Sequence, residues 1–383
     1  MKIFIKIIII FIITFILFAQ KTMADEKIKI GLLIPLSGQD REIGNSIIKS
    51  IRLAVNKINN PLIEIIPRDT ASDPEITFKQ AKKLNELGVK IIIGPIFNKN
   101  LIYLEELKEM IFLSLTNKII DNPKNIISAG INAGSQFNTI KKFQEINNLN
   151  NTIILIPREN YREEIDKAIK HSKIKKKKIY YYDSDPTKLT KQIEKITKYP
   201  QRKQNVLDEI KRLELSDDLN KDKKIEKLKK RDTLGNINFD SVIISDFDES
   251  LKSITTSLLY TDVSPKKTLF ITLNQWFDES LLKETSAQPI YFPSINKKNY
   301  DDFIANYYKI FSEYPNQLSF LSYDLIGLVY YLIAQNNFTI NQKIFIKKNQ
   351  FKGKVGIFDI KQNKINHILN FYKVEENNFK KIF

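Results

Sequence analysis

The chain contains no cysteine, and this absence removes several kinds of chemistry at once. Disulfides, thiolate nucleophiles, cysteine-ligated zinc and lipid attachment at a cysteine are all excluded. Histidine is scarce as well, because only His171 and His367 occur, both in stretches rich in lysine or asparagine. We expect both histidines to lie at the surface, so the sequence argues against a histidine-based metal site or general base.

Motifs that carry catalytic chemistry are also missing. The chain has no Walker loop, no G-x-G-x-x-G, no G-x-S-x-G and no H-E-x-x-H. Asp246 and Asp248 could share a face at the end of a predicted strand. Nothing else completes an acid–base site around them. We therefore expect a non-enzymatic protein that uses no metal or other cofactor.

The formal net charge is +17. Such an excess would suit an acidic partner, such as an anionic membrane surface or a nucleic acid. The joint abundance of isoleucine, lysine and asparagine, whose codons are AT-rich, offers a simpler explanation, which we favour. No zinc finger, RRM-like aromatic motif or helix-turn-helix signature occurs. We expect no nucleic-acid partner, and membrane association only through a partner protein.

Residues 1–24 have the pattern of a signal peptide. Lys2 and Lys6 precede an apolar run over residues 7–19. This run is shorter than the roughly 20 apolar residues of a membrane-spanning helix, so cleavage is favoured over an uncleaved anchor. Cleavage would remove these two lysines and Lys21, which lowers the formal charge of +17 by three to +14. The pattern predicts a periplasmic protein.

The rest of the chain is organised around its first predicted strand and helix. Residues 28–36 are nearly all apolar, as in a strand buried on both faces. Isoleucine, alanine and valine then recur every three or four positions over residues 43–58, which indicates an amphipathic helix. This order is half of a βαβ unit and predicts a parallel sheet. Ligands bind outside the carboxyl ends of such strands, which points to Ser37 and Gly38.

Several motifs give the chain a resemblance to a known family. They include IGLLIPLSG at residues 30–38, DTASDP at 69–74, a Gly-Pro strand end at 94–95 and FKGKVGIFD at 351–359. Together they resemble the type I periplasmic binding proteins of the leucine/isoleucine/valine-binding group. The W-x-D sequence at Trp276 and the DTLG sequence at 232–235 are most similar to the penicillin-binding-protein activators that reuse this fold.

The resemblance implies an α/β fold of two doubly wound parallel-sheet lobes joined by three crossovers. It places residues 27–131 plus 297–352 in lobe 1, and residues 133–293 plus 355–383 in lobe 2. Residues 188–231 are rich in lysine and acidic residues and show weak helical spacing. We expect this segment to form an exposed, charged helical insert on lobe 2, which either contacts a protein partner or is a solvated elaboration.

The resemblance also implies a ligand cleft between the carboxyl edges of the two sheets. The alternative role of Thr116 is to turn the chain, and that of Tyr161, Phe247 and Trp276 is to complete the core. Polar and aromatic residues at strand ends are the candidates for ligand binding: Ser37, Gly38, Asn98, Ser114, Thr116, Tyr161, Phe247, Asn274 and Trp276.

Asn274 stands where amino-acid-binding relatives carry a carboxylate for the ligand ammonium, and an amide cannot supply that charge. The sequence therefore favours an activator-like regulator of cell-wall synthesis, with a cell-wall synthase as its partner. The alternative is the solute-binding subunit of an ABC transporter, which delivers an amino acid or related small polar ligand to a permease.

Overall fold

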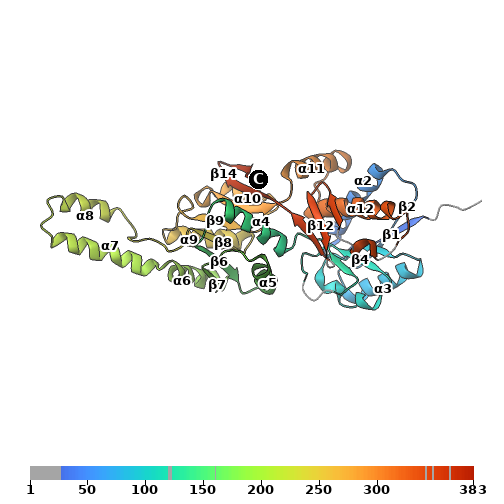
Figure 1. Ribbon diagram of the computed structural model, residues 1–383, viewed down its shortest axis with the longest axis horizontal. Coiled ribbons are helices and arrows are strands. Elements are labelled where there is room, and N and C mark those ends of the chain that lie inside the picture. The colour runs from blue at the N-terminus through green and yellow to red at the C-terminus, as the bar shows by residue number, and fades with distance from the viewer. Residues whose placement is uncertain (1–26, 120–122, 160, 341–342, 347–348, 362–363) are drawn as a thin grey trace, which may run out of the picture.

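The computed structural model describes residues 27–119, 123–159, 161–340, 343–346, 349–361 and 364–383. The expected signal peptide, residues 1–24, lies outside the described residues. The described chain forms two sheets with helices on their faces, and Figure 1 shows them as two lobes along the long axis of the molecule.

Lobe 1 is built on an eight-stranded sheet in the order β11-β12-β13-β5-β4-β3-β1-β2. Five of its strands are parallel neighbours: β1 (Ile28–Ile34), β2 (Ile63–Asp69), β3 (Ile91–Ile93), β4 (Ile111–Ser114) and β5 (Ile126–Ser128). The other three are β11 (Asn349–Lys352), β12 (Ile357–Lys361) and β13 (Lys364–Ile368), which pair with one another in antiparallel fashion. Sheet β1–β5 is apolar on both faces because helices cover both sides.

The helices of lobe 1 are α2 (Arg41–Ile58), α3 (Pro74–Glu86), α11 (Lys297–Phe311), α12 (Gln317–Gln335) and α13 (Lys343–Ile346). Two short 3₁₀ helices, η1 (Asn98–Leu101) and η2 (Leu104–Glu106), lie between β3 and β4. Helix α12 is long and apolar enough to cross a membrane by length and composition alone, but 61% of its apolar window is buried. It packs along α2, as a core helix does.

Lobe 2 has a seven-stranded sheet in the order β15-β14-β10-β9-β8-β6-β7. The strands are β6 (Thr152–Pro157), β7 (Lys178–Tyr182), β8 (Ser241–Ile244), β9 (Leu269–Thr272), β10 (Ile290–Ser294), β14 (Asn370–Glu375) and β15 (Asn378–Lys381). Its helices are α4 (Ala133–Ile146), α5 (Arg162–Ser172), α6 (Pro186–Thr197), α9 (Asp248–Tyr260), α10 (Ser280–Lys283) and the short η3 (Thr285–Ala287). The two lobes thus form the expected α/β architecture.

The chain passes between the lobes after β5, after β10 and after β13. The predicted third crossing is wrong, because strands β12 and β13 belong to the lobe 1 sheet and not to lobe 2. Strands β12 and β13 form a hairpin, and β13 begins beside β5, with Lys364 opposite Ser128. This hairpin extends the lobe 1 sheet, so the return to lobe 2 comes only at Leu369.

The expected insert is also shorter than predicted. Helix α6 packs against α9, and its Leu189 and Ile193 lie in the main core of the molecule. Only α7 (Tyr199–Glu214) and α8 (Lys221–Lys229) leave the lobe, as a helical hairpin that projects from the far end of lobe 2 in Figure 1. We call residues 199–235 the arm.

Candidate functional site

The turn after β1 places Ser37 and Gly38 at the carboxyl edge of the lobe 1 sheet. Both residues are exposed, and Gly38 has a φ of +74°. Asp69, at the end of β2, accepts hydrogen bonds from the N–H groups of Leu36 and Ala71, each at 2.8 Å. Burial acts to raise the pKa of Asp69, but hydrogen bonds from Ser37 and these N–H groups lower it overall. Asp69 therefore holds the turn in place as a charged acceptor.

The lobe 1 hydroxyl groups expected to bind ligand are bonded within the protein. Ser114 is fully buried, and its Oγ donates to the carbonyl of Pro95 at 2.7 Å. Thr116 is 6% exposed, and its Oγ1 accepts from the N–H of Lys118 at 3.2 Å. These bonds fit the alternative that Thr116 turns the chain. Asn98 begins η1 and is half-buried.

An aromatic pair marks the corresponding edge of lobe 2. The rings of Tyr161 and Phe247 meet edge to face with centroids 6.1 Å apart, and both residues are half-buried. The Tyr161 hydroxyl reaches the carbonyl of Ser245 at 3.3 Å and Oδ1 of Asp246 at 3.4 Å. Both rings pack against the hydrophobic core of lobe 2 and are only partly covered at this edge.

Asp246 lies beneath this aromatic pair as a buried carboxylate. It accepts hydrogen bonds from the Tyr182 hydroxyl and from the N–H of Phe247. Burial raises the pKa of Asp246, and burial together with the Asp246 charge raises those of Tyr161 and Tyr182. Asp248 is exposed at the start of α9, so the two aspartates do not form the acidic pair that strand spacing allowed.

The side-chain oxygen of Asn274 helps to hold lobe 2 together, because Oδ1 accepts from Ser294 at 2.7 Å and from the N–H of Trp276 at 3.1 Å. The backbone N–H of Asn274 donates to Oε1 of Gln136 at 2.8 Å. Asn274 is 5% exposed. Its side chain thus ties β9 to β10 and to the following loop, and it offers no charge to a ligand ammonium.

Trp276 brings the two lobes into contact. It is half-buried, with a φ of +48°, and its ring lies 6.4 Å from that of Tyr300 on α11. A second link is a hydrogen bond from the N–H of Ile119 in lobe 1 to Oε1 of Glu164 in lobe 2, at 3.0 Å. These are two of several contacts between the lobes, which also include hydrogen bonds from the N–H of His367 to Oγ of Ser135 at 2.9 Å and from the N–H of Lys297 to the Tyr372 hydroxyl at 3.0 Å.

Two cavities lie away from the predicted ligand-binding residues. One of about 480 Å³ is lined by residues of α2, α12 and the β11–β12 segment, and another of about 320 Å³ by residues of α4, α5 and β13. None of the nine predicted ligand-binding residues lines either cavity. Among the described residues, no group of three or more histidine, cysteine, aspartate or glutamate side chains is placed to hold a metal ion.

His367 is placed differently from the sequence expectation. It is 7% exposed, its Nε2 lies 3.0 Å from the carbonyl of Ala129, and burial lowers its pKa to about 4. The surface prediction was therefore wrong for His367, because β13 lies inside the lobe 1 sheet. His171 is exposed, as expected.

Sequence reasoning missed the partners that fix the strand ends. Gln136 and Ser294 hold Asn274 from positions 138 and 20 residues away in the chain. Tyr182, which binds Asp246, is the last tyrosine of a run of three. The run of tyrosines ends at the carboxyl edge of the lobe 2 sheet. Its position at the end of a predicted strand is the one sequence signal that could have identified Tyr182.

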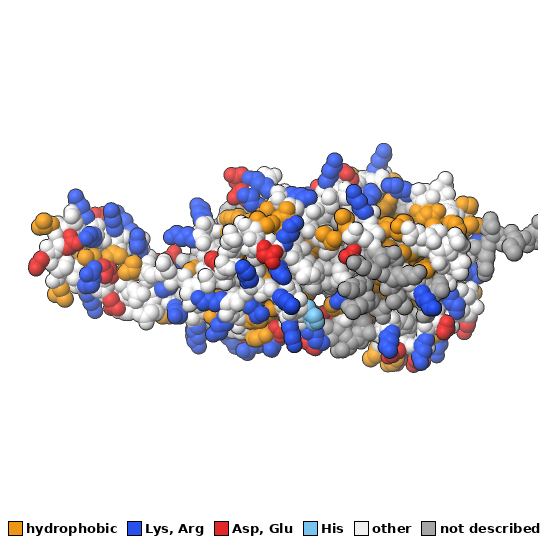
Figure 2. Space-filling model, in the orientation of Figure 1, with side chains coloured by type: hydrophobic (Ala, Val, Ile, Leu, Met, Phe, Trp, Pro, Cys, Tyr) orange, Lys and Arg blue, Asp and Glu red, His pale blue; other side chains and the backbone are white. Residues whose placement is uncertain are grey.

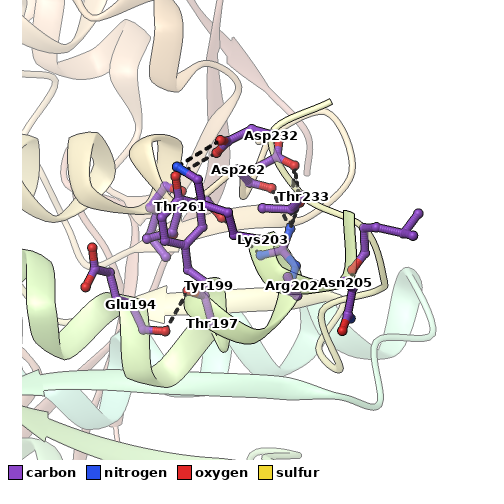
Figure 3. A network of polar contacts seen from close by, with 12 residues as sticks. Glu194, Thr197, Tyr199, Arg202, Lys203, Asn205, Asp232, Thr233, Thr261 and Asp262 are labelled. Atoms are coloured by element: carbon purple, nitrogen blue, oxygen red, sulfur yellow. Dashed lines mark hydrogen bonds and ion pairs between the residues drawn. The ribbon is translucent and has the colours of Figure 1, made fainter. Parts of the chain in front are cut away.

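The arm is a second candidate site, and a polar network joins it to lobe 2 (Figure 3). Arg202, only 8% exposed at its side chain, donates to the carbonyl of Thr261 at 3.0 Å and to Oγ1 of Thr233 at 2.7 Å. Its Nη2 also lies 3.6 Å from Oδ2 of Asp262. Burial lowers the pKa of this arginine. The Tyr199 hydroxyl donates to Asp232 at 2.8 Å, which ties the two ends of the arm to each other.

Beyond this network the arm has a small core of its own. Val206, Leu213, Ile225 and Leu228 pack together apart from the lobes. At the outer end Leu215 is 89% exposed and Leu219 fully exposed. Figure 2 shows the arm standing clear of the body, with hydrophobic side chains among charged ones at its end. Two leucines held this far into solvent form a small apolar tip on a fixed support.

Comparison with known proteins agrees with this architecture. A family model described as periplasmic binding protein matches residues 27–106. No curated protein matches the chain significantly.

Solved structures match along most of the chain. The C-domain of LpoA from Haemophilus influenzae, a regulator of PBP1A, is 15% identical with a TM-score of 0.62, and the match covers 93% of this chain and 100% of that one. Against full-length LpoA the match covers 59% of the longer protein. A putative branched-chain amino acid ABC transporter protein from Rhodospirillum rubrum is 12% identical with a TM-score of 0.68, covering 93% and 100%.

The substrate-binding protein LivJ from Streptococcus pneumoniae, solved with isoleucine, is 15% identical with a TM-score of 0.54, covering 93% of this chain and 99% of that one. Identities this low establish the fold and leave the role open between regulators and transport proteins. The chain has the fold of a type I periplasmic binding protein, with two α/β lobes and a helical arm.

Proposed function

We propose that this protein is a non-enzymatic, periplasmic regulator of cell-wall synthesis that binds a penicillin-binding protein of the PBP1A type. The observation that carries the proposal is the state of Asn274. It replaces the carboxylate that an amino-acid ligand would need, and its side-chain oxygen accepts hydrogen bonds from Ser294 and from the N–H of Trp276. An ammonium group enclosed beside it would lose its hydration without gaining a charge partner, which costs several kcal/mol.

The lobe 1 hydroxyl groups support the same proposal. Ser114 donates its hydroxyl to the carbonyl of Pro95, and Thr116 accepts a hydrogen bond from the N–H of Lys118. A ligand carboxylate could accept from Ser114 only by replacing its bond to Pro95, and this exchange would give little net gain. The edge of lobe 1 therefore favours a fixed structure over a binding surface for amino acids.

The arm supplies a surface for a protein partner. Its buried arginine and its own small core hold it as a fixed projection. Leu215 and Leu219 at its end are too exposed to stabilise the fold, so their contribution would come in a complex. The similarity to the LpoA C-domain, a regulator of PBP1A, supports a synthase as that partner.

The experiment measures binding of the purified synthase to immobilised wild-type protein and to the Leu215→Ser/Leu219→Ser variant. We expect the double substitution to weaken binding about tenfold or more, because two buried leucines each contribute roughly 1.5–3 kcal/mol. The matched control is Leu87→Ser/Ile102→Ser on lobe 1, where the two side chains are 43% and 65% exposed. Equal binding by both variants, or no binding by the wild type, would refute the proposal.

A solute-binding role in an ABC transporter is the second candidate. The exposed turn at Ser37 and Gly38 and the aromatic pair Tyr161 and Phe247 favour it, because these groups remain accessible at the two carboxyl edges. Thermal denaturation with and without L-isoleucine, L-leucine, small peptides and muropeptides tests this role. A rise in melting temperature with a leucine-like ligand would support transport over regulation.

A further inference from the structure

The cavity of about 480 Å³ on lobe 1 lies away from the cleft and from the arm. Its volume is within the range of small-molecule sites, which is about 300–1,000 Å³. Helix α2 supplies Ala54 and Lys57, helix α12 supplies Tyr323 and Gly327, and the β11–β12 segment supplies Phe351 and Lys352 among the lining residues. Three elements far apart in the sequence thus form one hollow, since α2 packs along α12.

The walls of this cavity are held by a buried carboxylate. Asp324 is 5% exposed and accepts the N–H groups of Lys354 at 2.9 Å and Val355 at 2.7 Å. A Cβ on Gly353 would lie 2.1 Å from the same carboxylate, so only glycine lets the segment approach α12 this closely. Asn299 donates to the carbonyl of Lys354 at 2.8 Å. The hollow is therefore a fixed feature of lobe 1.

Gly327 lies on the floor of the cavity, in the interior of α12. Glycine there destabilises a helix relative to alanine. Sterics do not demand it, because an added Cβ would meet only the Phe351 ring, at an ordinary 3.5 Å. The glycine has one clear effect, which is to leave the space beside Phe351 unfilled.

Charge around the opening is strongly positive. Lys57, Lys352 and Lys354 line the cavity, against a single acidic residue, Asp324, whose oxygens are taken by backbone N–H groups. Within the described part of the chain, Lys57 and Lys352 form no ion pair, and Lys354 lies over the Tyr323 ring at 5.3 Å. The cavity combines an apolar interior with a cationic rim.

We propose that this cavity binds a small amphiphilic anion, with an apolar or aromatic body between Tyr323 and Phe351 and a carboxylate, sulfonate or phosphate group at the lysines. An uncharged apolar molecule would leave the lysines unused, and a small inorganic anion would leave the apolar interior empty. The site is separate from the cleft and the arm, so it does not depend on the proposed regulatory function.

The test uses a matched pair of dyes. The probe 8-anilinonaphthalene-1-sulfonate has an aromatic body with a sulfonate, and N-phenyl-1-naphthylamine has the same body without charge. We expect the sulfonate dye to bind the purified protein with a stoichiometry of one and a Kd on the order of 10 µM, as its size allows. Fluorescence titration gives the affinity and calorimetry the stoichiometry.

Two variants probe the two halves of the site. Lys57→Gln/Lys352→Gln should weaken binding of the sulfonate dye about tenfold and leave the neutral dye unaffected. Lys298→Gln/Lys309→Gln, two exposed lysines of α11 outside the cavity, is the charge-matched control and should change neither. Gly327→Leu should abolish binding of the sulfonate dye, because the side chain fills the floor.

Gly327→Ala guards against loss of the fold. Because its Cβ fits, this variant should melt about 2 °C above the wild type and bind the sulfonate dye more weakly. The proposal would be overturned if the wild type bound no dye, or if the lysine and glycine variants titrated like the wild type. A melting temperature for Gly327→Ala below that of the wild type would also count against it, because the glycine would then serve packing.

Discussion

Helix α6 and the arm form one charged stretch in the sequence, yet they are attached to the molecule in different ways. Helix α6 buries Leu189 and Ile193 in the main core, beside α9. The arm buries most of its apolar residues against each other. It joins lobe 2 through Arg202 and its polar partners, and through Tyr199, whose ring lies 5.5 Å from that of Tyr260 on α9. One segment is therefore part of the lobe, and the other is a separate unit fastened to it.

This difference indicates which part of the protein can be altered without unfolding the two lobes. Few buried apolar contacts cross from the arm to lobe 2, so its loosening should not unfold the lobes. A surface on such a unit can be shaped by a partner while the core stays fixed. The following predictions test this contrast, from the largest expected effect to the smallest.

The largest effect is expected in the lobe. Ile193→Ala removes a fully buried side chain from α6 and should lower the free energy of unfolding by about 3 kcal/mol. Because this residue belongs to the main core, urea denaturation followed by far-UV circular dichroism should show the whole protein destabilised. If the substitution reduced protection from hydrogen exchange only in the arm, α6 would belong with the arm, and the contrast between the two segments would be wrong.

The arm should respond locally. Arg202→Ala removes a buried cation together with its hydrogen bonds. We expect the attachment of the arm to lobe 2 to be destabilised by about 2 kcal/mol. Hydrogen exchange should rise across residues 199–235, while the urea midpoint of the lobes stays nearly the same. Arg212→Ala, on the exposed face of α7 beside Glu209, is the control and should leave exchange at the base of the arm unchanged.

The buried Asp324 of lobe 1 should make the free energy of unfolding of the whole molecule depend on pH. Burial raises the pKa of Asp324 to about 6, from 3.8 for an unburied aspartate, against the lowering effect of the Val355 and Lys354 N–H groups. Between about pH 4 and pH 6 the folded state therefore holds a proton that the unfolded state has released. Wild-type stability should fall through this window as pH rises, by about 3 kcal/mol.

The variant Asp324→Asn isolates this effect. This variant should be less stable than the wild type at pH 4, because an amide has only one acceptor oxygen and its NH2 group would face the second backbone N–H. The difference in the free energy of unfolding between the two proteins should become smaller towards pH 7. Urea unfolding at half-unit steps of pH measures the difference. A gap that stays constant with pH would show that Asp324 does not titrate in this range.

The smallest effect is expected at the tip of the arm. Leu219→Ser alters a fully exposed side chain and should change the free energy of unfolding by less than about 0.5 kcal/mol. Thermal denaturation of the purified protein checks this. A larger loss would mean that the tip packs against another part of the chain, and its role as a contact surface would then lose support.

The fold could be predicted from the sequence because its signals are local. A run such as residues 28–34 is apolar throughout, and the next helix repeats apolar residues every three or four positions. The third crossing could not be placed, because β12 and β13 look alike in sequence whether they pair with lobe 1 or lobe 2. The pairing of Lys364 with Ser128 in the structure assigns these two strands to lobe 1.

The candidate site was less predictable for a related reason. Positions such as Ser114 and Asn274 were identified from where strands end, which spacing does reveal. What their polar atoms bind depends on Pro95, Gln136 and Ser294, which come from other elements. Hydrogen-bond partners fixed by packing leave no periodic trace, so occupied and free polar groups look the same in a sequence.

Titration with L-isoleucine, followed by thermal denaturation, tests most directly whether the strand-end side chains are committed to the protein itself. We predict no change in melting temperature up to millimolar isoleucine. A ligand with a Kd of about 10 µM would, at about 1 mM, add roughly 2.7 kcal/mol to the stability of the folded state. A concentration-dependent rise in melting temperature of several degrees would contradict the account.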